Sequence, residues 1–186
     1  MTIVTKKGDK KKTQLVTGEE VSKASIQIEA FGALDVLNSF LGLARSTLTL
    51  MKGEGMSNLA KDIKELQMDL FRFGTELGST NPASREWVEL TSESHVKWIE
   101  GRITALEEMV KLPSAFVIPG ACQASAMVDM ARSIARKVER YVVALAEEGA
   151  YDNPQGLIYV NRLSDYLFLL ARAIEHFAGI SPDIKE

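Results

Sequence analysis

Apolar side chains recur at intervals of three and four residues through most of this chain. The clearest run lies between residues 56 and 77 and comprises Met56, Leu59, Ile63, Leu66, Leu70, Phe73 and Leu77. Such spacing places side chains along one side of an α-helix, because the helix completes a turn every 3.6 residues. Similar stripes run from about residue 25 to 51, and over 96–110, 127–145 and 160–177. The pattern therefore predicts an all-α protein with five amphipathic helices.

Helix-breaking residues fall between these stripes. They are Gly53 with Gly55, Asn81-Pro82, Leu112-Pro113, Pro119-Gly120 and Gly149. Asn153-Pro154 offers a cap and a first turn for the last helix. Because the connections are short, neighbouring helices should run antiparallel, as in an up-and-down five-helix bundle. Residues 25–180 are expected to form this single helical domain, and residues 1–24 an irregular segment in which any strand is short.

Length and composition narrow the class further. A chain of 186 residues with 46% hydrophobic and 25% charged residues can bury the core of one domain. The single Cys122 cannot form an internal disulfide, and we interpret it as a small buried residue. No apolar run approaches the roughly 20 residues of a membrane span, and the N-terminus lacks a secretory signal. We therefore expect a cytoplasmic protein that does not contact a membrane.

The net charge of −3 conceals an asymmetry. Residues 1–12 carry five lysines against Asp9, a balance of +4, so the remainder of the chain carries −7. A short basic segment on an acidic body suits a small polyanion better than a nucleic acid, because duplex binding usually needs an extended basic face. The alternative is a solvated tail without a ligand.

Charged residues gather on one side of the fourth helix. Arg132, Arg136, Glu139 and Arg140 follow one another at helical spacing. They lie nearly opposite the apolar stripe of the same helix. One interpretation is a solvated face held by weak ion pairs. The other is a set of guanidinium groups for a carboxylate or phosphate, which the planar, permanently charged arginine suits.

Two further helices carry polar groups away from their apolar stripes. On the fifth helix, Asn161, Asp165, Phe168 and Arg172 share one face. An aromatic ring among polar groups indicates a second packing surface, for a subunit or for a ligand. On the first helix, Asp35 neighbours Asn38, and Asp35 could pair with an arginine of the fourth helix, within the chain or across an interface.

Other chemistries lack their motifs. Neither His95 nor His176 has the Glu-x-x-His spacing of a di-iron site, so both are interpreted as structural. The sequence has no nucleophile elbow, no Walker A loop and no dinucleotide-binding glycine motif. No Cys/His cluster indicates zinc, and we expect no protein-bound metal centre.

Four segments together resemble one known family, the ATP:cob(I)alamin adenosyltransferases that accompany propanediol utilisation. The similarity extends from about residue 3 to 176, with the motifs in family order. The segments are Thr5-Lys-Lys-Gly-Asp9 with Thr13 and Gly18–Lys23, Glu29–Ser39, Phe116–Gly120 running into Ala131–Arg140, and Val160–Phe168.

This resemblance implies a homotrimer of five-helix subunits with ATP and corrinoid bound between neighbours. The implied reaction transfers the 5′-deoxyadenosyl group of ATP to the cobalt of cob(I)alamin, giving adenosylcobalamin and triphosphate. Reduced cobalt is itself a strong nucleophile, so the protein needs to position C5′ and to stabilise the leaving group. Mg²⁺ is expected on the triphosphate, and a cobalamin reductase is an expected partner.

Matching the motifs assigns roles to residues of this chain. The resemblance implies phosphate binding by Thr5, Gly8, Asp9, Thr13 and Lys23. It implies nucleotide contacts and subunit pairing by Arg132, Arg136, Glu139 and Arg140, and an ATP contact by Asn161. Asp35 would pair with Arg132 across the interface.

Phe116 matches the aromatic residue below the corrin ring. An apolar wall there would exclude the lower axial ligand, leaving four-coordinate cobalt(II) that is easier to reduce. On this resemblance Phe116, Arg132 and Asp35 are the candidate catalytic residues.

The chain departs from the family pattern at four positions. Lys11 and Ala121 replace glycines, Glu20 replaces a basic residue, and Asp129 replaces a histidine. A glycine in a phosphate loop often has a positive φ or allows close backbone approach. These departures motivate one alternative, a diverged bundle that binds a corrinoid or nucleotide without catalysis. A second alternative is a structural trimeric bundle that binds neither.

Overall fold

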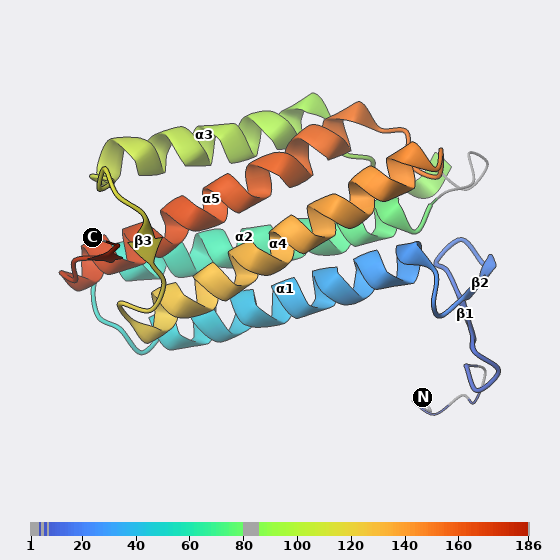
Figure 1. Ribbon diagram of the computed structural model, residues 1–186, viewed down its shortest axis with the longest axis horizontal. Coiled ribbons are helices and arrows are strands. Elements are labelled where there is room, and N and C mark those ends of the chain that lie inside the picture. The colour runs from blue at the N-terminus through green and yellow to red at the C-terminus, as the bar shows by residue number, and fades with distance from the viewer. Residues whose placement is uncertain (1–3, 5, 7, 80–85, 186) are drawn as a thin grey trace.

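Five long helices pack side by side, with successive helices running in opposite directions (Figure 1). The computed structural model describes residues 4, 6, 8–79 and 86–185. Its helices are α1 (Ile26–Leu48), α2 (Glu54–Leu77), α3 (Glu93–Met109), α4 (Gln123–Glu147) and α5 (Pro154–Ala178). The predicted all-α bundle is therefore confirmed, with each helix within a few residues of its sequence stripe.

The apolar stripes meet in one core. All seven residues of the α2 stripe are buried, and so are Leu163, Leu167 and Ile174 of α5. α5 contributes the most buried side chains because it packs on both α3 and α4. The last residue of its predicted stripe, Phe177, is instead 40% exposed at the end of the helix. Its ring lies against Gly55, where an added Cβ would collide with it.

Local signals fix the helix ends. The Ser25 Oγ accepts a hydrogen bond from the Ile28 amide at 3.4 Å and begins α1. The Asn153 side chain accepts one from the Gln155 amide at 3.0 Å and begins α5 in front of Pro154. Gly179 ends α5 in a left-handed conformation with φ of 66°, which glycine adopts without a steric cost.

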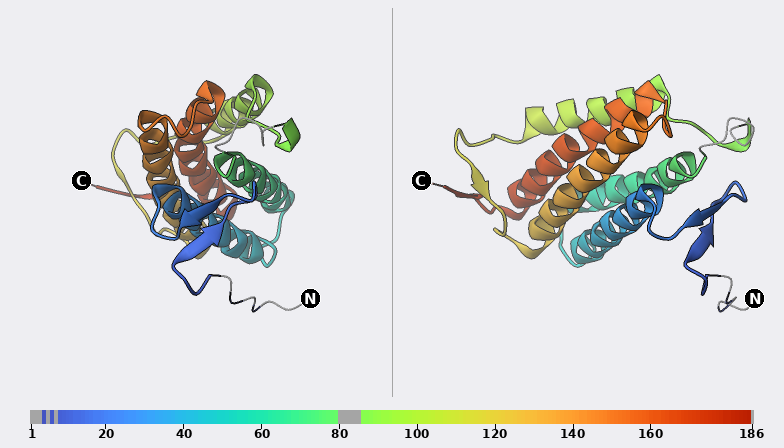
Figure 2. Two further views of the ribbon diagram at one scale, coloured as in Figure 1. Left: turned by 90° about the vertical axis from the view of Figure 1, so that its right-hand side faces the viewer. Right: turned by 45° about the vertical axis from the view of Figure 1, so that its right-hand side comes forward.

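The N-terminal segment is more regular than expected. Strands β1 (Lys12–Gln14) and β2 (Glu20–Ser22) form an antiparallel hairpin in which Thr13 faces Val21. Each strand has only three residues, as expected of a segment in which any strand is short, and such strands are too short to show clear alternation in the sequence. The hairpin stands beyond the N-terminal end of α1, as Figure 2 shows.

The C-terminal residues return to the connection between α3 and α4. Strand β4 (Asp183–Ile184) pairs antiparallel with β3 (Val117–Ile118). The Lys185 amide then donates to the Phe116 carbonyl at 2.8 Å. The two short strands therefore hold the backbone on which Phe116 stands.

Helix α1 is long and apolar enough to cross a membrane by length and composition alone. Four of its leucines, however, belong to the core: Leu34, Leu37, Leu41 and Leu48 are each at most 5% exposed. They pack against α2 and α4. These leucines account for part of the apolar character of α1, whereas Val36 and Leu43 of the same helix are 43% and 49% exposed.

A buried carboxylate connects several segments at one end of the bundle. Glu76, near the end of α2, is 2% exposed. It accepts hydrogen bonds from the Thr91 amide at 2.7 Å, the Tyr151 hydroxyl at 2.6 Å and the Asn153 amide group at 2.7 Å. Arg72 lies 3.3 Å away on the same helix. One side chain therefore ties α2 to the segments that precede α3 and α5.

We expect Glu76→Gln to lower the free energy of unfolding by about 2–4 kcal/mol. The amide group of glutamine would face donors that now share a carboxylate, leaving at least one buried donor unpaired. Urea denaturation followed by circular dichroism measures the change. The exposed Glu108→Gln on α3 is the control, and equal stabilities for the two variants would contradict the assignment.

Candidate functional site

Two cavities together contain six of the twelve residues to which the resemblance assigns a role. The first, of about 690 Å³, lies on the N-terminal segment and is called the basic cavity; it is lined by Lys6, Gly8, Lys10, Lys12, Thr13, Gln14, Glu20 and Lys23. The second, of about 460 Å³, lies between α4, α5 and the α3–α4 connection and is called the aromatic cavity. It is lined by Glu107, Leu112, Ala115, Phe116, Val117, Arg132, Arg136, Ser164, Asp165, Phe168 and Leu169.

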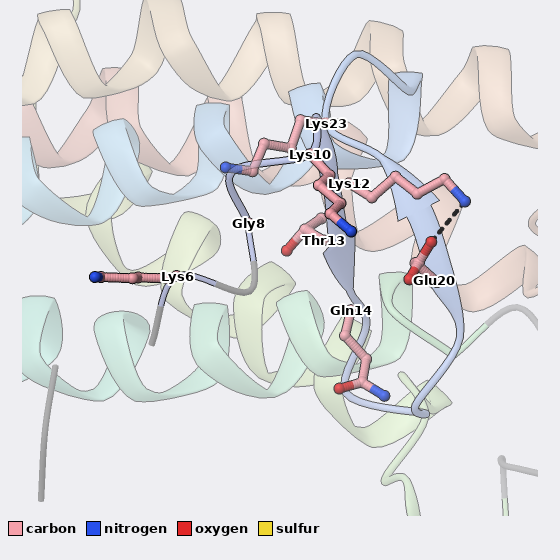
Figure 3. Close-up of a pocket in the computed structure, with 8 residues that line it drawn as sticks. All are labelled: Lys6, Gly8, Lys10, Lys12, Thr13, Gln14, Glu20 and Lys23. Carbon is pink, nitrogen blue, oxygen red and sulfur yellow. Dashed lines mark ion pairs between the residues drawn. The ribbon is translucent and has the colours of Figure 1, made fainter. Parts of the chain in front are cut away.

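The basic cavity concentrates positive charge. Four lysines line it against one carboxylate, Glu20. The Glu20 carboxylate lies 2.6 Å from the Lys12 ammonium, and both side chains are about 60% exposed. Figure 3 shows Lys12 turned toward Glu20, whereas Lys23 extends toward the backbone at Gly8. Lys6, Lys10 and Lys23 therefore remain as cations without an ion-pair partner among the described residues.

Backbone conformation shapes the same cavity. A Cβ at Gly8 would lie 2.7 Å from the Lys23 Nζ, so the absence of a side chain at Gly8 leaves room for that ammonium group. Lys11 has a φ of +64°, a left-handed conformation that costs a non-glycine residue roughly 1–2 kcal/mol. Its carbonyl accepts a hydrogen bond from the Lys23 amide at 3.0 Å. The conformation expected of a glycine is therefore present at Lys11.

The structure gathers most of the predicted phosphate-binding residues. Gly8, Thr13 and Lys23 all line the basic cavity. Asp9 is exposed beside it, and its amide donates to the Lys6 carbonyl at 3.4 Å to close a turn. Thr5 lies outside the described residues.

The aromatic cavity brings the fourth and fifth helices together with the α3–α4 connection. Arg132 and Arg136 reach it from α4, and Asp165 and Phe168 reach it from α5. Phe116 is 84% exposed, an unusual state for a phenylalanine held by backbone pairing. Guanidinium groups and an uncovered aromatic ring thus face the same space.

The remaining candidates on these helices lie outside the aromatic cavity. The Asn161 amide group donates to the Glu139 carboxylate at 2.7 Å, which links α5 to α4. Arg140 is exposed and has no ion pair among the described residues. Glu139, Arg140 and Asn161 stand further toward the C-terminal end of α4, where α5 begins. They continue the polar strip that starts at Arg132.

Asp35 does not pair with an arginine of its own chain. It is exposed on α1, and the described residues offer it no ion pair. Arg132 instead has its Nε 3.3 Å from the Asp129 carboxylate on its own helix. Pairing of Asp35 with Arg132 across an interface stays a prediction.

Arg172 shares the α5 face of Asp165 and Phe168, as its spacing predicts, but it is buried there. It is only 2% exposed and contacts two buried carboxylates, those of Asp129 and Glu175, which sequence reasoning missed as partners. Spacing could have indicated Glu175, which follows Arg172 by three residues, but not Asp129, which lies on another helix.

The two cavities lie at different ends of the bundle. The hairpin that carries the basic cavity stands beyond the N-terminal end of α1, whereas the β3 segment beside Phe116 lies at the other end (Figure 1). Over its 23 residues α1 is about 35 Å long, at a rise of 1.5 Å per residue. Within a single chain, the lysines of the basic cavity therefore lie far from Phe116.

A metal centre of protein side chains is not found in the described part of the chain, where no three His, Cys, Asp or Glu residues group to hold an ion. His95 has a structural role, because its Nδ1 accepts a hydrogen bond from the Ser92 amide at 3.0 Å and caps α3. Cys122 is half-buried at the start of α4 rather than fully buried as expected.

Comparison with known proteins points to one family. The family model described as cobalamin adenosyltransferase matches residues 3–174. A corrinoid adenosyltransferase of Bacillus subtilis is 37% identical over 97% of this chain and 90% of its own length. The corrinoid adenosyltransferase PduO of Salmonella typhimurium is 35% identical over the whole chain, which spans about half (53%) of that relative.

Solved structures give the same result. A variant PduO-type ATP:corrinoid adenosyltransferase from Lactobacillus reuteri, complexed with cobalamin and ATP, superposes with a TM-score of 0.88. It is 29% identical, and the match covers 100% of this chain and 99% of that one.

Proposed function

The chain belongs to the cobalamin adenosyltransferase family and catalyses the ATP-dependent adenosylation of a corrinoid, and we propose that two copies of the chain build each site together. The cobalt of cob(I)alamin attacks C5′ of ATP and forms the cobalt–carbon bond with its own electron pair. The C5′–O bond breaks, and triphosphate leaves with the electrons of that bond.

The basic cavity is the proposed triphosphate site, and it is the observation that carries the proposal. Negative charge develops on the leaving oxygen in the transition state, so fixed cations there lower the barrier. Lys6, Lys10 and Lys23 supply such charge without an ion-pair partner among the described residues, and Thr13 adds a hydroxyl donor. We assign residues 1–24, including Thr5 and Asp9, to this phosphate-binding segment.

The aromatic cavity is the proposed corrinoid site. The exposed Phe116 ring has no lone pair with which to coordinate a metal, and Phe168, Leu112 and Leu169 add apolar surface to the same cavity. Such a floor excludes a lower axial ligand from cobalt(II). Losing that donor makes the ion easier to reduce, which favours the nucleophilic cobalt(I) state. A cytoplasmic reductase is the proposed electron source.

Assembly of a homotrimer would bring the two cavities together. Within one chain the basic cavity and Phe116 lie at different ends of the bundle, so one nucleotide does not reach both. The exposed Asp35 on α1 suits pairing with Arg132 of a neighbouring copy. Arg136, Glu139, Arg140 and Asn161 then form the strip along which the nucleotide lies between the two cavities.

Magnesium enters this proposal as part of the MgATP substrate. The described residues offer no three-ligand protein cluster, and Glu20 is the one carboxylate that lines the basic cavity. Phosphate oxygens and water, the ligands that Mg²⁺ prefers, would therefore hold the ion. Its charge adds to that of the lysines on the leaving group.

We expect Phe116→Ala to abolish the shift from five- to four-coordinate cobalt(II) that ATP should induce in the wild-type protein. Electronic spectra of cob(II)alamin titrated with ATP measure it, and turnover should fall at least tenfold. Ile118→Ala, an exposed apolar residue of the same connection that does not line the cavity, is the matched control. A normal shift in Phe116→Ala would overturn the corrinoid assignment.

We expect Arg132→Ala and Asn161→Ala each to lower kcat/KM at least tenfold with unchanged helical content, since both remove contacts proposed for the nucleotide. The formation of adenosylcobalamin from ATP, Mg²⁺ and cob(I)alamin is the assay, with the exposed Lys64→Ala on α2 as control. Isothermal titration calorimetry tests the non-catalytic alternative, which requires ligand binding without release of triphosphate.

Three substitutions at Lys11 separate conformation from charge. Lys11→Gly and Lys11→Asn both tolerate the observed φ of +64° and should keep the KM for ATP within about threefold. Lys11→Val resists that conformation and should raise the KM at least tenfold. Steady-state kinetics decide between the two causes: an equal rise in all three variants would show that the charge of Lys11 matters instead.

A further inference from the structure

A buried ion network lies directly behind the aromatic cavity. Asp129 on α4 and Arg172 and Glu175 on α5 are exposed by 3%, 2% and 1%. The Arg172 Nη2 donates to the Asp129 Oδ2 at 2.7 Å and to the Glu175 Oε1 at 2.8 Å. Burying three charges carries a desolvation cost that such pairs often only offset, so stability alone is a weak reason for the network.

The network has one negative charge in excess, and a residue of the cavity balances it. Arg172 faces two carboxylates, and the second oxygen of Asp129, Oδ1, accepts from the Nε of Arg132 at 3.3 Å. Asp129 therefore connects a buried arginine with a cavity-lining one. The Arg132 side chain is 29% exposed, as expected for a group at the edge of the cavity.

This contact determines how Arg132 presents its guanidinium group. Its Nε edge is held by Asp129, and neither Nη group makes a hydrogen bond or ion pair with the described residues. A guanidinium is planar, so fixing the Nε edge also fixes the direction of both Nη groups. They remain available for a substrate or for the carboxylate of a neighbouring copy.

The same buried arginine contacts the cavity a second time. The Arg172 guanidinium carbon lies 5.3 Å from the centroid of the Phe168 ring, within the range of a cation–π contact. Phe168 is a wall of the aromatic cavity. Arg172 therefore supports both the arginine and an aromatic ring of the cavity.

We propose that Asp129, clamped by Arg172 and Glu175, is a positioning residue that aims Arg132 into the aromatic cavity. The inference rests on the proposed role of Arg132 at the nucleotide. It assigns no substrate contact to Asp129, because each of its two carboxylate oxygens accepts a hydrogen bond from an arginine.

A double-mutant cycle between Asp129→Asn and Arg132→Ala tests the proposal through kcat and KM for ATP. Asparagine keeps the shape of the side chain but loses the charge that two arginines share. We expect Asp129→Asn to lower kcat/KM about tenfold in the wild-type background and less than twofold in the Arg132→Ala background. Ser133→Ala, which removes only a hydroxyl bonded to the Asp129 carbonyl, is the control and should stay within twofold.

An equal loss in both backgrounds would overturn the proposal, because Asp129 would then act on the fold rather than through Arg132. No loss in either background would also overturn it. A failure of the proposed function would give a different result, namely normal turnover in Arg132→Ala alone. That result would remove the premise that Arg132 acts at the nucleotide.

Asp129→Glu covers the case in which Asp129→Asn does not fold. Glutamate keeps the charge that the buried Arg172 requires but moves the carboxylate by one methylene. We expect kcat/KM to fall at least fivefold in the wild-type background and less than twofold with Arg132→Ala, at unchanged helical content. Full activity in Asp129→Glu would show that only the charge is needed, and would overturn the positioning role.

Discussion

The rest of the structure depends on the packing of α4 between α1 and α5. The buried side of α4 is built from small residues, among them Ala131, Ala135 and Val138, which allow the neighbouring helices to approach closely. The buried residues of α4 lie on one side of the helix. Arg132 and Arg136 fall between them in the sequence, so they lie on the other side and face outward. The 3.6-residue repeat of α4 therefore places both the buried core residues and the polar strip that starts at Arg132.

An antiparallel bundle of long helices also fixes the distance between its ends. The hairpin with its lysines extends from the start of α1, whereas Phe116 stands on the connection that leads into α4 (Figure 1). The proposed reaction needs both a polyphosphate site and an apolar floor, so this separation within one chain supports the proposed assembly of several copies.

Sequence periodicity predicted the helices and their buried sides. It failed for features that depend on contacts between residues distant in the sequence. The α2 stripe is one unbroken pattern, so its burial followed from spacing alone, and Arg132 and Arg136 followed from the opposite arc of α4. β3 and β4 could not be predicted, because two-residue strands are defined by backbone pairing between distant segments. Arg172 shares the face of Asp165, yet it is buried because Asp129 of another helix neutralises it. No single-helix pattern contains that information.

The structure explains how the N-terminal segment accommodates its two departures from the family pattern, Lys11 and Glu20. Lys11 keeps the left-handed backbone that a glycine would adopt, and the strain is offset locally by the hydrogen bond from the Lys23 amide to its carbonyl. Glu20 introduces a negative charge, but it lies against Lys12 rather than against the lysines that remain without an ion-pair partner among the described residues. The proposed phosphate site requires a positive balance, and the lysines of the basic cavity supply it despite Glu20. Lys11 and Glu20 are therefore compatible with the proposed site.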